Sequence, residues 1–119
     1  MVQPELDHRR FLAEGRFMLQ RAPSGRFVHP PRIAEPGSGD ALEWVAADGR
    51  GTVHSVTVVR SKPPAANYNV ALIDLVEGVR LMSRVDGIAP EAVQIGLAVV
   101  AKIVVENDTP LLVFVPQAP

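Results

Sequence analysis

Apolar and polar residues alternate along much of this chain in short runs that glycine and proline separate. Runs of β-branched and aliphatic residues cover residues 42–47, 51–60, 68–76, 79–84, 99–105 and 111–115. Such runs favour strands, and the Asp-Gly, Pro-Pro and Glu-Gly pairs between them favour turns. The Glu77-Gly78 pair is short enough to predict a hairpin between its neighbours. Together with one small helical segment near residues 90–93, the pattern predicts an all-β barrel or sandwich.

The first part of the chain follows a different pattern. Residues 4–14 predict a short helix, because proline suits a first helical turn and Gly15 suits a helix end. Residues 17–21 and 26–28 predict two short strands on either side of a Pro-Ser-Gly turn. Residues 30–41 hold several prolines and glycines and predict an irregular loop.

Five blocks of sequence resemble one known family in their order and spacing. The blocks are residues 11–16 (FLAEGR), 26–32 (RFVHPPR), 42–44 (LEW), 49–55 (GRGTVHS) and 70–81 (VALIDLVEGVRL). Over nearly its whole length the chain is similar to the rubredoxin-like zinc-ribbon plus OB-fold proteins, a domain of unknown function often encoded with thiolase-like enzymes. The resemblance implies an OB-fold-type barrel of five or six strands over residues 42–119. It also implies that residues 1–41 form a helix and a zinc-ribbon hairpin.

The chain departs from this family where the family binds zinc. A structural zinc site needs about four thiolate or imidazole ligands converging at roughly 2.3 Å from the metal. The corresponding positions carry Ala22, Ser24, Glu35 and Ser38, and the sequence contains no cysteine. We therefore expect a degenerate ribbon hairpin without zinc, and we expect no tightly bound cofactor. A mixed metal site built from His29, Glu35 and Asp40 is the alternative.

Length and composition narrow the possibilities further. The 119 residues are 47% hydrophobic and 21% charged, which predicts one globular barrel with a small appendage. Twelve basic against 13 acidic residues give a net charge of -1, and this balance disfavours general nucleic-acid binding. No apolar run of about 18 residues predicts a membrane-spanning helix. The absence of cysteine and of an apolar leader favours the cytoplasm.

The strand runs also predict a core. Six aliphatic residues are expected inside the barrel: Val53, Ile73, Leu75, Leu81, Val99 and Val113.

Side chains able to do chemistry are scattered, and no catalytic residue is predicted. His8, His29 and His54 have no second ligand at helical spacing and no nucleophile beside them, so we interpret them as surface or structural histidines. Asp74 lies inside an apolar run and needs a partner, which Arg80 or Arg84 could supply across the hairpin.

The segment Gly49-Arg50-Gly51 is similar to a phosphate loop but precedes a strand rather than a helix. We interpret it as a turn or bulge that lets the first barrel strand bend. Arg50, Arg60 and Lys62 fall near loops, where they are candidates to contact the phosphates of coenzyme A.

The resemblance implies a function through a partner. Relatives pack on thiolases, acyltransferases or side-chain aldolases, sometimes with an acyl-CoA channel at the contact. We expect a non-catalytic accessory subunit of a thiolase-like acyl-CoA enzyme, with a coenzyme A thioester at the interface. The apolar side chains of the appendage exceed what so small a unit buries by itself, and they are the expected partner contacts: Leu6, Phe11, Leu12, Phe17 and Phe27.

Two alternatives come from other classes of protein. OB barrels also bind single-stranded nucleic acid through aromatic stacking in a basic groove. Here Tyr68 and Phe114 are the main barrel aromatics and the charge is balanced, which disfavours stacking. A small acyl-CoA enzyme acting alone is the third possibility, and the lack of a nucleophile disfavours it.

Overall fold

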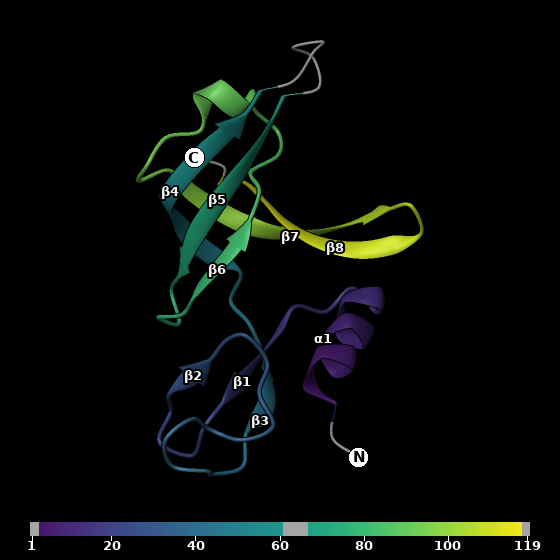
Figure 1. Ribbon diagram of the computed structural model, residues 1–119, viewed down its shortest axis with the longest axis vertical. Coiled ribbons are helices and arrows are strands. Elements are labelled where there is room, and N and C mark those ends of the chain that lie inside the picture. Colours follow the sequence, from purple (N-terminus) through teal and green to yellow (C-terminus); the bar gives the residue numbers. More distant parts are fainter. Residues whose placement is uncertain (1–2, 61–66, 118–119) are drawn as a thin grey trace.

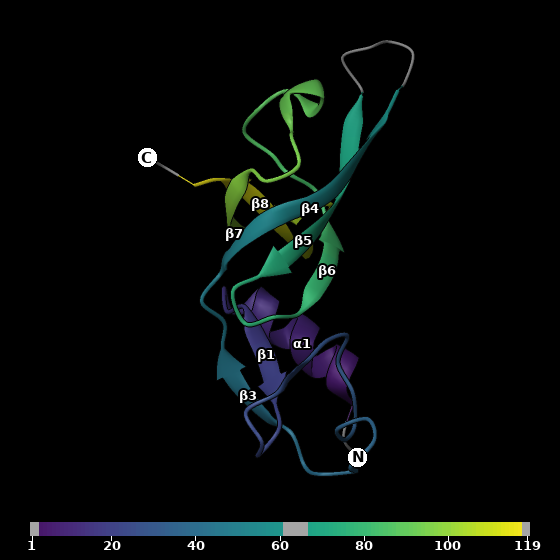
Figure 2. The same ribbon diagram turned by 90° about the vertical axis from the view of Figure 1, so that its left-hand side faces the viewer.

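The computed structural model describes residues 3–60 and 67–117, which fold into two β-sheets stacked along the longest axis (Figures 1 and 2). The elements in chain order are α1 (Pro4–Ala13), β1 (Met18–Arg21), β2 (Phe27–Val28), β3 (Glu43–Ala46), β4 (Arg50–Val59), β5 (Tyr68–Leu75), β6 (Arg80–Ser83), the 3-10 helix η2 (Pro90–Ala92), β7 (Ala98–Glu106) and β8 (Thr109–Pro116). This architecture confirms the predicted all-β class with a short N-terminal helix.

The smaller sheet has the strand order β2-β1-β3, and we call this sheet with its loops the ribbon. β3 pairs with β1 over four residues, from Met18 opposite Ala46 to Arg21 opposite Glu43. The prediction that residues 42–47 form the first barrel strand is therefore wrong. Alternating polarity determines which face a side chain occupies but does not select the neighbouring strand. The hydrogen bonds of β3 place this strand in the smaller sheet, together with the predicted appendage.

The larger sheet is an OB-type barrel with the strand order β6-β5-β4-β7-β8. β5 and β6 form the predicted hairpin, with Gly78 at a φ of 95° in the turn. The two edge strands meet beyond the end of β6, where Val85 bridges Phe114. The Phe114 N–H donates to Arg84 O at 3.0 Å, and the Asp86 N–H donates to Phe114 O at 2.8 Å. These two bonds close the barrel.

The bend of β4 arises at His54 rather than at the glycines. The β4–β5 register shifts between Val53 and Ser55, so His54 is the extra residue of a β-bulge. Gly49 lies in the short connection between β3 and β4 and has a φ of 92°. Gly51 serves a close approach, because a Cβ there would stand 2.8 Å from the carbonyl oxygen of Asp74.

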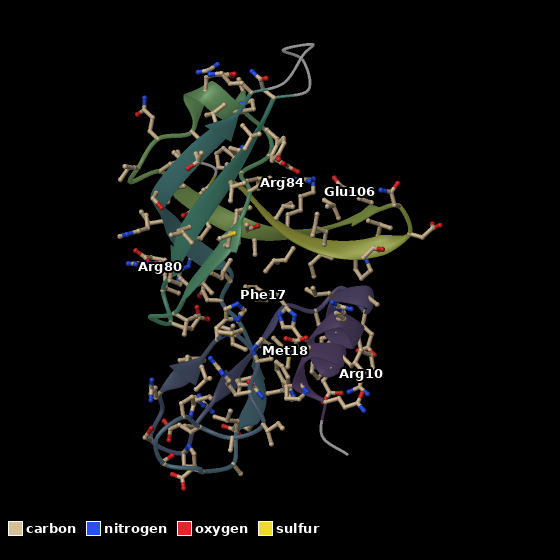
Figure 3. All side chains as sticks on the ribbon, viewed as in Figure 1. Arg10, Phe17, Met18, Arg80, Arg84 and Glu106 are labelled. Carbon is tan, nitrogen blue, oxygen red and sulfur yellow. The ribbon has the colours of Figure 1, made fainter. Side chains whose placement is uncertain are left out.

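Ribbon and barrel share one hydrophobic core. All six predicted core residues are buried, which confirms that prediction. Leu19 of β1 is 1% exposed and belongs to the same cluster, and Phe17 and Phe27 pack against it. Figure 3 shows Phe17 at the junction of the two sheets. The appendage thus covers one end of the barrel and buries part of its apolar surface there, although Leu6 remains 56% exposed.

The β7–β8 hairpin extends past the barrel and over α1 (Figure 1). We call its outer part, residues 102–112, the arm. Arg84 holds it from the end of β6: its guanidinium bonds Asp86 at 2.8 Å and also Glu106 of the arm (Figure 3). These bonds lower the pKa of Glu106, chiefly through the Arg84 hydrogen bond, and raise that of Arg84. In the described part of the chain, no helix is long and apolar enough to cross a bilayer.

Candidate functional site

Two tight turns stand where a zinc ribbon carries its ligand pairs. In the first, the Ala22 N–H donates to Arg26 O and the Gly25 N–H donates to Ala22 O, both at 2.8 Å. In the second, the Glu35 N–H donates to Asp40 O and the Gly39 N–H donates to Glu35 O, both at 2.9 Å. Main-chain bonds therefore close both turns.

Side chains also connect the two turns. Glu35 is only 7% exposed, and its Oε1 accepts a hydrogen bond of 2.5 Å from Ser38 Oγ. Arg26 Nη1, from the first turn, lies 3.8 Å from Glu35 Oε2 and donates to Pro36 O at 3.5 Å. Both carboxylate oxygens of Glu35 are thus engaged by protein groups. Among residues 3–60 and 67–117 the structure forms no group of three or more metal-type ligands, so it does not assemble the mixed His29–Glu35–Asp40 site.

Two of the three histidines meet where α1 lies against the ribbon. The rings of His8 and His29 are 6.3 Å apart, and Trp44 lies 6.2 Å from His8. His8 Nε2 is buried and has no hydrogen-bond partner within the part of the chain that the structure describes. Burial lowers the pKa of both rings, and the neighbouring His8 lowers that of His29 further. Both rings are therefore neutral at pH 7 and pack as part of the helix contact.

The third histidine belongs to an exposed ion cluster on the barrel. Asp74 stands opposite Arg80 across the β5–β6 hairpin, and Arg80 Nε donates to Asp74 Oδ1 at 2.6 Å. His54 Nδ1 lies 3.3 Å from the other Asp74 oxygen. The Arg80 hydrogen bond is the main cause of the lowered pKa of Asp74. The predicted Arg80 partner is confirmed, but Asp74 points toward solvent rather than into the core.

The five predicted partner contacts differ in exposure. Leu12 is buried, Phe11 packs edge-on against Trp44 at 5.3 Å, and Leu6 is 56% exposed. Phe17 and Phe27 pack against the shared core as described above. Leu6 is thus the one large exposed hydrophobic residue of this set.

Arg50 and Arg60, two of the three predicted coenzyme A contacts, lie at opposite ends of β4. Arg50 begins β4 and makes two bonds to Asp48, at 2.6 and 3.0 Å. Arg60 follows the other end of β4 and lies 3.9 Å from Glu91. A ten-residue strand spans about 30 Å, so one phosphate cannot contact both side chains. Lys62 lies outside the described residues.

Among the grooves that the described residues form between the ribbon with its helix and the barrel, two concern the candidate site. The first, the arm groove, runs between α1 and the arm and is lined by His8, Arg9, Leu12, His29, Leu81, Met82 and residues 109–112. On its barrel side, Met82 is 71% exposed and Leu111 is 37% exposed. An adjoining groove on the barrel adds Tyr68, which is 50% exposed. We call Tyr68, Met82 and Leu111 the apolar face.

The second groove, the junction groove, lies between the first ribbon turn and the β5–β6 turn. It is lined by Gly25, Arg26, Phe27, Val28, His29, Arg32, Pro36, Glu77, Gly78, Val79 and Arg80. Sequence reasoning missed this groove, because its charged residues come from segments about fifty positions apart. Sequence reasoning also missed the apolar face, because the strand pattern does not distinguish Met82 from a buried strand residue.

The aromatic residues of the barrel do not form a stacking platform. Phe114 is fully buried at 0% exposure, which leaves Tyr68 as the exposed ring on the described barrel strands. Base stacking along a strand needs several exposed rings. The nucleic-acid alternative therefore gains no support from the structure.

Comparison with known proteins identifies relatives of this chain. Residues 44–104 match the family model for the C-terminal OB-fold domain of ChsH2. The chain is 36% identical over 111 residues to a probable enoyl-CoA hydratase alpha subunit of Thermomonospora curvata, with 87% of this chain and 34% of the relative covered. It is 33% identical over 103 residues to the 3-oxo-4,17-pregnadiene-20-carboxyl-CoA hydratase alpha subunit of Mycobacterium tuberculosis, with 83% and 33% covered. The chain spans about a third of the length of these curated relatives.

A solved structure is similar over the whole chain. It is described as an Ltp2-ChsH2(DUF35) aldolase, and the matching chain is 31% identical with a TM-score of 0.86. The match covers 99% of this chain and 98% of that chain. Both the ribbon and the barrel therefore have counterparts in that structure.

Proposed function

The chain belongs to the family of ChsH2 C-terminal OB-fold domains, and on that premise we propose that it is an accessory subunit of a thiolase-like acyl-CoA enzyme. In this proposal it performs no chemistry itself and supports the assembly or activity of the enzyme that it binds. A coenzyme A thioester would lie near the contact between the two subunits.

The observation that carries the proposal is the full-length match to one chain of the Ltp2-ChsH2(DUF35) aldolase. At 31% identity and a TM-score of 0.86, the similarity extends beyond the barrel to the helix and ribbon. Two curated relatives are named as alpha subunits of CoA-thioester hydratases. The two curated relatives are thus both named as subunits of enzymes that act on CoA thioesters.

The side chains of the described residues support a non-catalytic role. The buried Nε2 of His8 has no hydrogen-bond partner among the described residues, and His54 is held by Asp74. Arg84 binds the carboxylate of Glu106, while Glu35 is bound by Ser38. General acid–base catalysis requires a side chain within hydrogen-bond reach of substrate, and structural partners already occupy the side chains of His54, Glu35, Arg84 and Glu106.

The apolar face is the best candidate for the contact with the enzyme. Met82 and Leu111 project from adjacent barrel edges beside the arm groove, and Tyr68 continues the surface. Buried apolar and aromatic side chains at the centre of an interface contribute most of its binding energy. Of the expected partner contacts on α1, Leu12 is buried within the chain, whereas Leu6 is 56% exposed and remains a candidate contact.

Co-expression with a thiolase-type acyl-CoA enzyme tests the proposal. The tagged chain is expected to retain the enzyme through affinity purification and gel filtration. Met82→Asp should abolish retention, because it places a charge at the centre of the contact. Ile95→Asp is the matched control, since Ile95 is 72% exposed but lies outside the apolar face. Equal retention by both variants, with folding verified by circular dichroism, would show that the contact lies elsewhere.

A further inference from the structure

The arm has two strand edges, one on β7 and one on β8. β7 pairs with β8 along the arm, and on its other side it pairs with β4 only as far as Val100. One further bond on that side joins the Ala101 N–H to Gly49 O at 2.8 Å. The arm extends past this point, away from β4 (Figure 1). In the described part of the chain, residues 102–106 therefore have no strand beside them on the β4 side.

The edge of β8 is closed to further pairing. Pro110 has no N–H to donate, and the carbonyl oxygen of Leu112 accepts a hydrogen bond from Ser83 Oγ at 2.9 Å. Phe114 uses its N–H and C=O in the two bonds that close the barrel. Proline and side-chain cover are common means by which proteins prevent an exposed edge from pairing with another strand. β8 is therefore not a template for another chain.

The edge of β7 has no such protection. Main-chain groups of alternate residues point to opposite sides of a strand in an antiparallel pair. Because Ala101 donates away from β8, Ile103 and Val105 also direct their N–H and C=O groups away from β8. Among residues 3–60 and 67–117, no hydrogen bond engages these four groups. We call them the β7 edge.

The β7 edge is accessible from outside. The side chain of Val105 is 70% exposed. Beside Ile103 lies a groove of about 510 Å³, whose other lining residues include Arg16 and Asp48. The ribbon and the start of β4 thus leave room beside the strand. Isoleucine and valine also have high strand propensity, which favours an extended backbone at this edge.

A second copy of the same segment fits the β7 edge in an antiparallel register. With Val104 opposite Val104 of the second copy, Ile103 lies opposite Val105 of that copy, and Val105 lies opposite its Ile103. Each of these two pairs exchanges both N–H···O=C bonds, so the contact gains four main-chain hydrogen bonds. The register ends one residue before Ala101, whose N–H is already bound to Gly49.

The same register places opposite charges together. Lys102 lies opposite Glu106 of the second copy, and the two-fold symmetry repeats this pair. Lys102 is exposed, and within the described ranges no ion pair engages its ammonium group. Arg84 holds the carboxylate of Glu106 in place and uses only part of its acceptor capacity. Opposite charges on directly opposed residues stabilise a strand pair, so this complementarity favours a second copy over a strand of unrelated sequence.

We propose that two copies of this chain join through their β7 edges into a continuous antiparallel sheet, with a two-fold axis at Val104. Addition of a strand to an exposed sheet edge is a common mode of recognition. Met82 and Leu111 of the apolar face lie on the β8 side of the arm, so the dimer leaves that face free to bind an enzyme. A contact of this size is small, and the dimer is therefore weak and dependent on concentration.

Sedimentation velocity of the isolated full chain measures the self-association. We expect monomer at about 10 µM and substantial dimer at about 1 mM, the range typical of a small transient interface. Amide hydrogen exchange by NMR on the same samples locates the contact. The N–H groups of Ile103 and Val105 should exchange about fivefold more slowly in the concentrated sample. The N–H of Val104, which is already bonded to β8, is the internal control and should change less.

A charge exchange tests the register. Lys102→Glu should weaken self-association about tenfold or more, because it places like charges opposite each other, and Glu106→Lys should do the same. An equimolar mixture of the two variants should form the dimer again, since each lysine then lies opposite a glutamate. Arg60→Glu is the matched control, because it makes the same change in charge at an exposed residue beyond the far end of β4. It should leave self-association unchanged.

Several results would overturn the proposal. They are a chain that stays monomeric at about 1 mM, equal slowing of exchange at Val104, a mixture of the charge variants that stays monomeric, and equal weakening by Arg60→Glu. Slower exchange at the β7 edge only after addition of a thiolase-type enzyme would assign this edge to the enzyme and would also overturn it. The measurements on the isolated chain contain no enzyme, so their failure leaves the accessory-subunit proposal intact.

Discussion

Replacing Glu35 by alanine should destabilise the chain by about 2 kcal/mol, because this carboxylate ties the second ribbon turn together and connects it to the first. Glu35 is 7% exposed and accepts the 2.5 Å bond from Ser38, and a hydrogen bond to a charged group contributes about 1.5–3 kcal/mol. The Arg26 contact at 3.8 Å adds at most roughly 1 kcal/mol, since the arginine side chain is 62% exposed and screened by water. The alanine variant no longer bears the desolvation cost of burying the carboxylate, and this gain offsets part of the loss. A loss of about 2 kcal/mol corresponds to a decrease in Tm of roughly 8 °C for a domain of this size.

Urea denaturation followed by Trp44 fluorescence measures this loss, because the sequence contains one tryptophan. A double-mutant cycle with Ser38→Ala isolates the hydrogen bond, and its coupling energy should be about 1 kcal/mol or more. Glu35→Gln is the conservative control, since an amide oxygen still accepts from Ser38, and it should lose about half as much stability. A loss below about 0.5 kcal/mol for Glu35→Ala, or additive effects of the two alanines, would refute this reasoning.

Elemental analysis provides an independent check on the same turns. With Ala22, Ser24, Glu35 and Ser38 at the former ligand positions, we expect no stoichiometric zinc in the purified chain and no change in Tm on adding a chelator. One zinc per chain after dialysis against a chelator would contradict the metal-free ribbon and revive the mixed site.

Three further predictions follow from the burial and charge of particular residues. Because burial lowers the pKa of His8 and His29, the folded state favours neutral rings. The stabilisation from these neutral rings should be fully present above the ordinary histidine pKa of 6.5 and should be lost as the pH falls from there through the lower folded-state pKa values. Urea denaturation followed by Trp44 fluorescence at several pH values measures this loss. Ile73→Ala should cost about 2–5 kcal/mol of unfolding free energy, because Ile73 is 0% exposed at the centre of the shared core. Arg84→Ala should speed hydrogen exchange in the arm about fivefold by releasing the hairpin from β6, a loss of roughly 1 kcal/mol in local stability.

Each of these predictions has a matched control. Glutamine at position 8 or 29 should flatten the pH profile, whereas Val76→Ala, which removes no titratable group, should leave its shape unchanged. Val76→Ala should cost under about 0.5 kcal/mol, because Val76 is 59% exposed. Arg16→Ala removes another exposed ion pair and should not alter exchange in the arm. A control variant whose measured effect equals that of its test variant would contradict the corresponding prediction.

The strands themselves could be predicted because β-branched and aliphatic runs separated by turn residues mark them. In β5, Asn69, Ala71, Ile73 and Leu75 are buried in strict alternation, but the sequence there is a nearly continuous apolar run, so it does not show which face is buried. The hairpin at Gly78 followed from its two-residue turn. The partner of β3 could not be predicted, since a four-residue strand fits either sheet and only tertiary packing selects β1.

The candidate sites depend on contacts between distant segments, which no local pattern encodes. His8 and His29 are 21 positions apart and meet only because α1 docks on the ribbon. Arg32 and Glu77 line one groove only because the ribbon caps the barrel through Leu19. Counting apolar residues in the appendage could not reveal that this cap buries them in a core shared with the barrel.

Light scattering on the gel-filtration peak of a mixture of this chain with a thiolase-type acyl-CoA enzyme tests the central claim most directly, when combined with acyl-CoA turnover across a titration of the chain. The accessory-subunit account predicts one peak with the mass of both subunits. It also predicts turnover that rises with added chain, saturates at the stoichiometry of that peak, and fails to rise with Met82→Asp. Separate peaks, together with an enzyme that is fully active without the chain, would contradict the account.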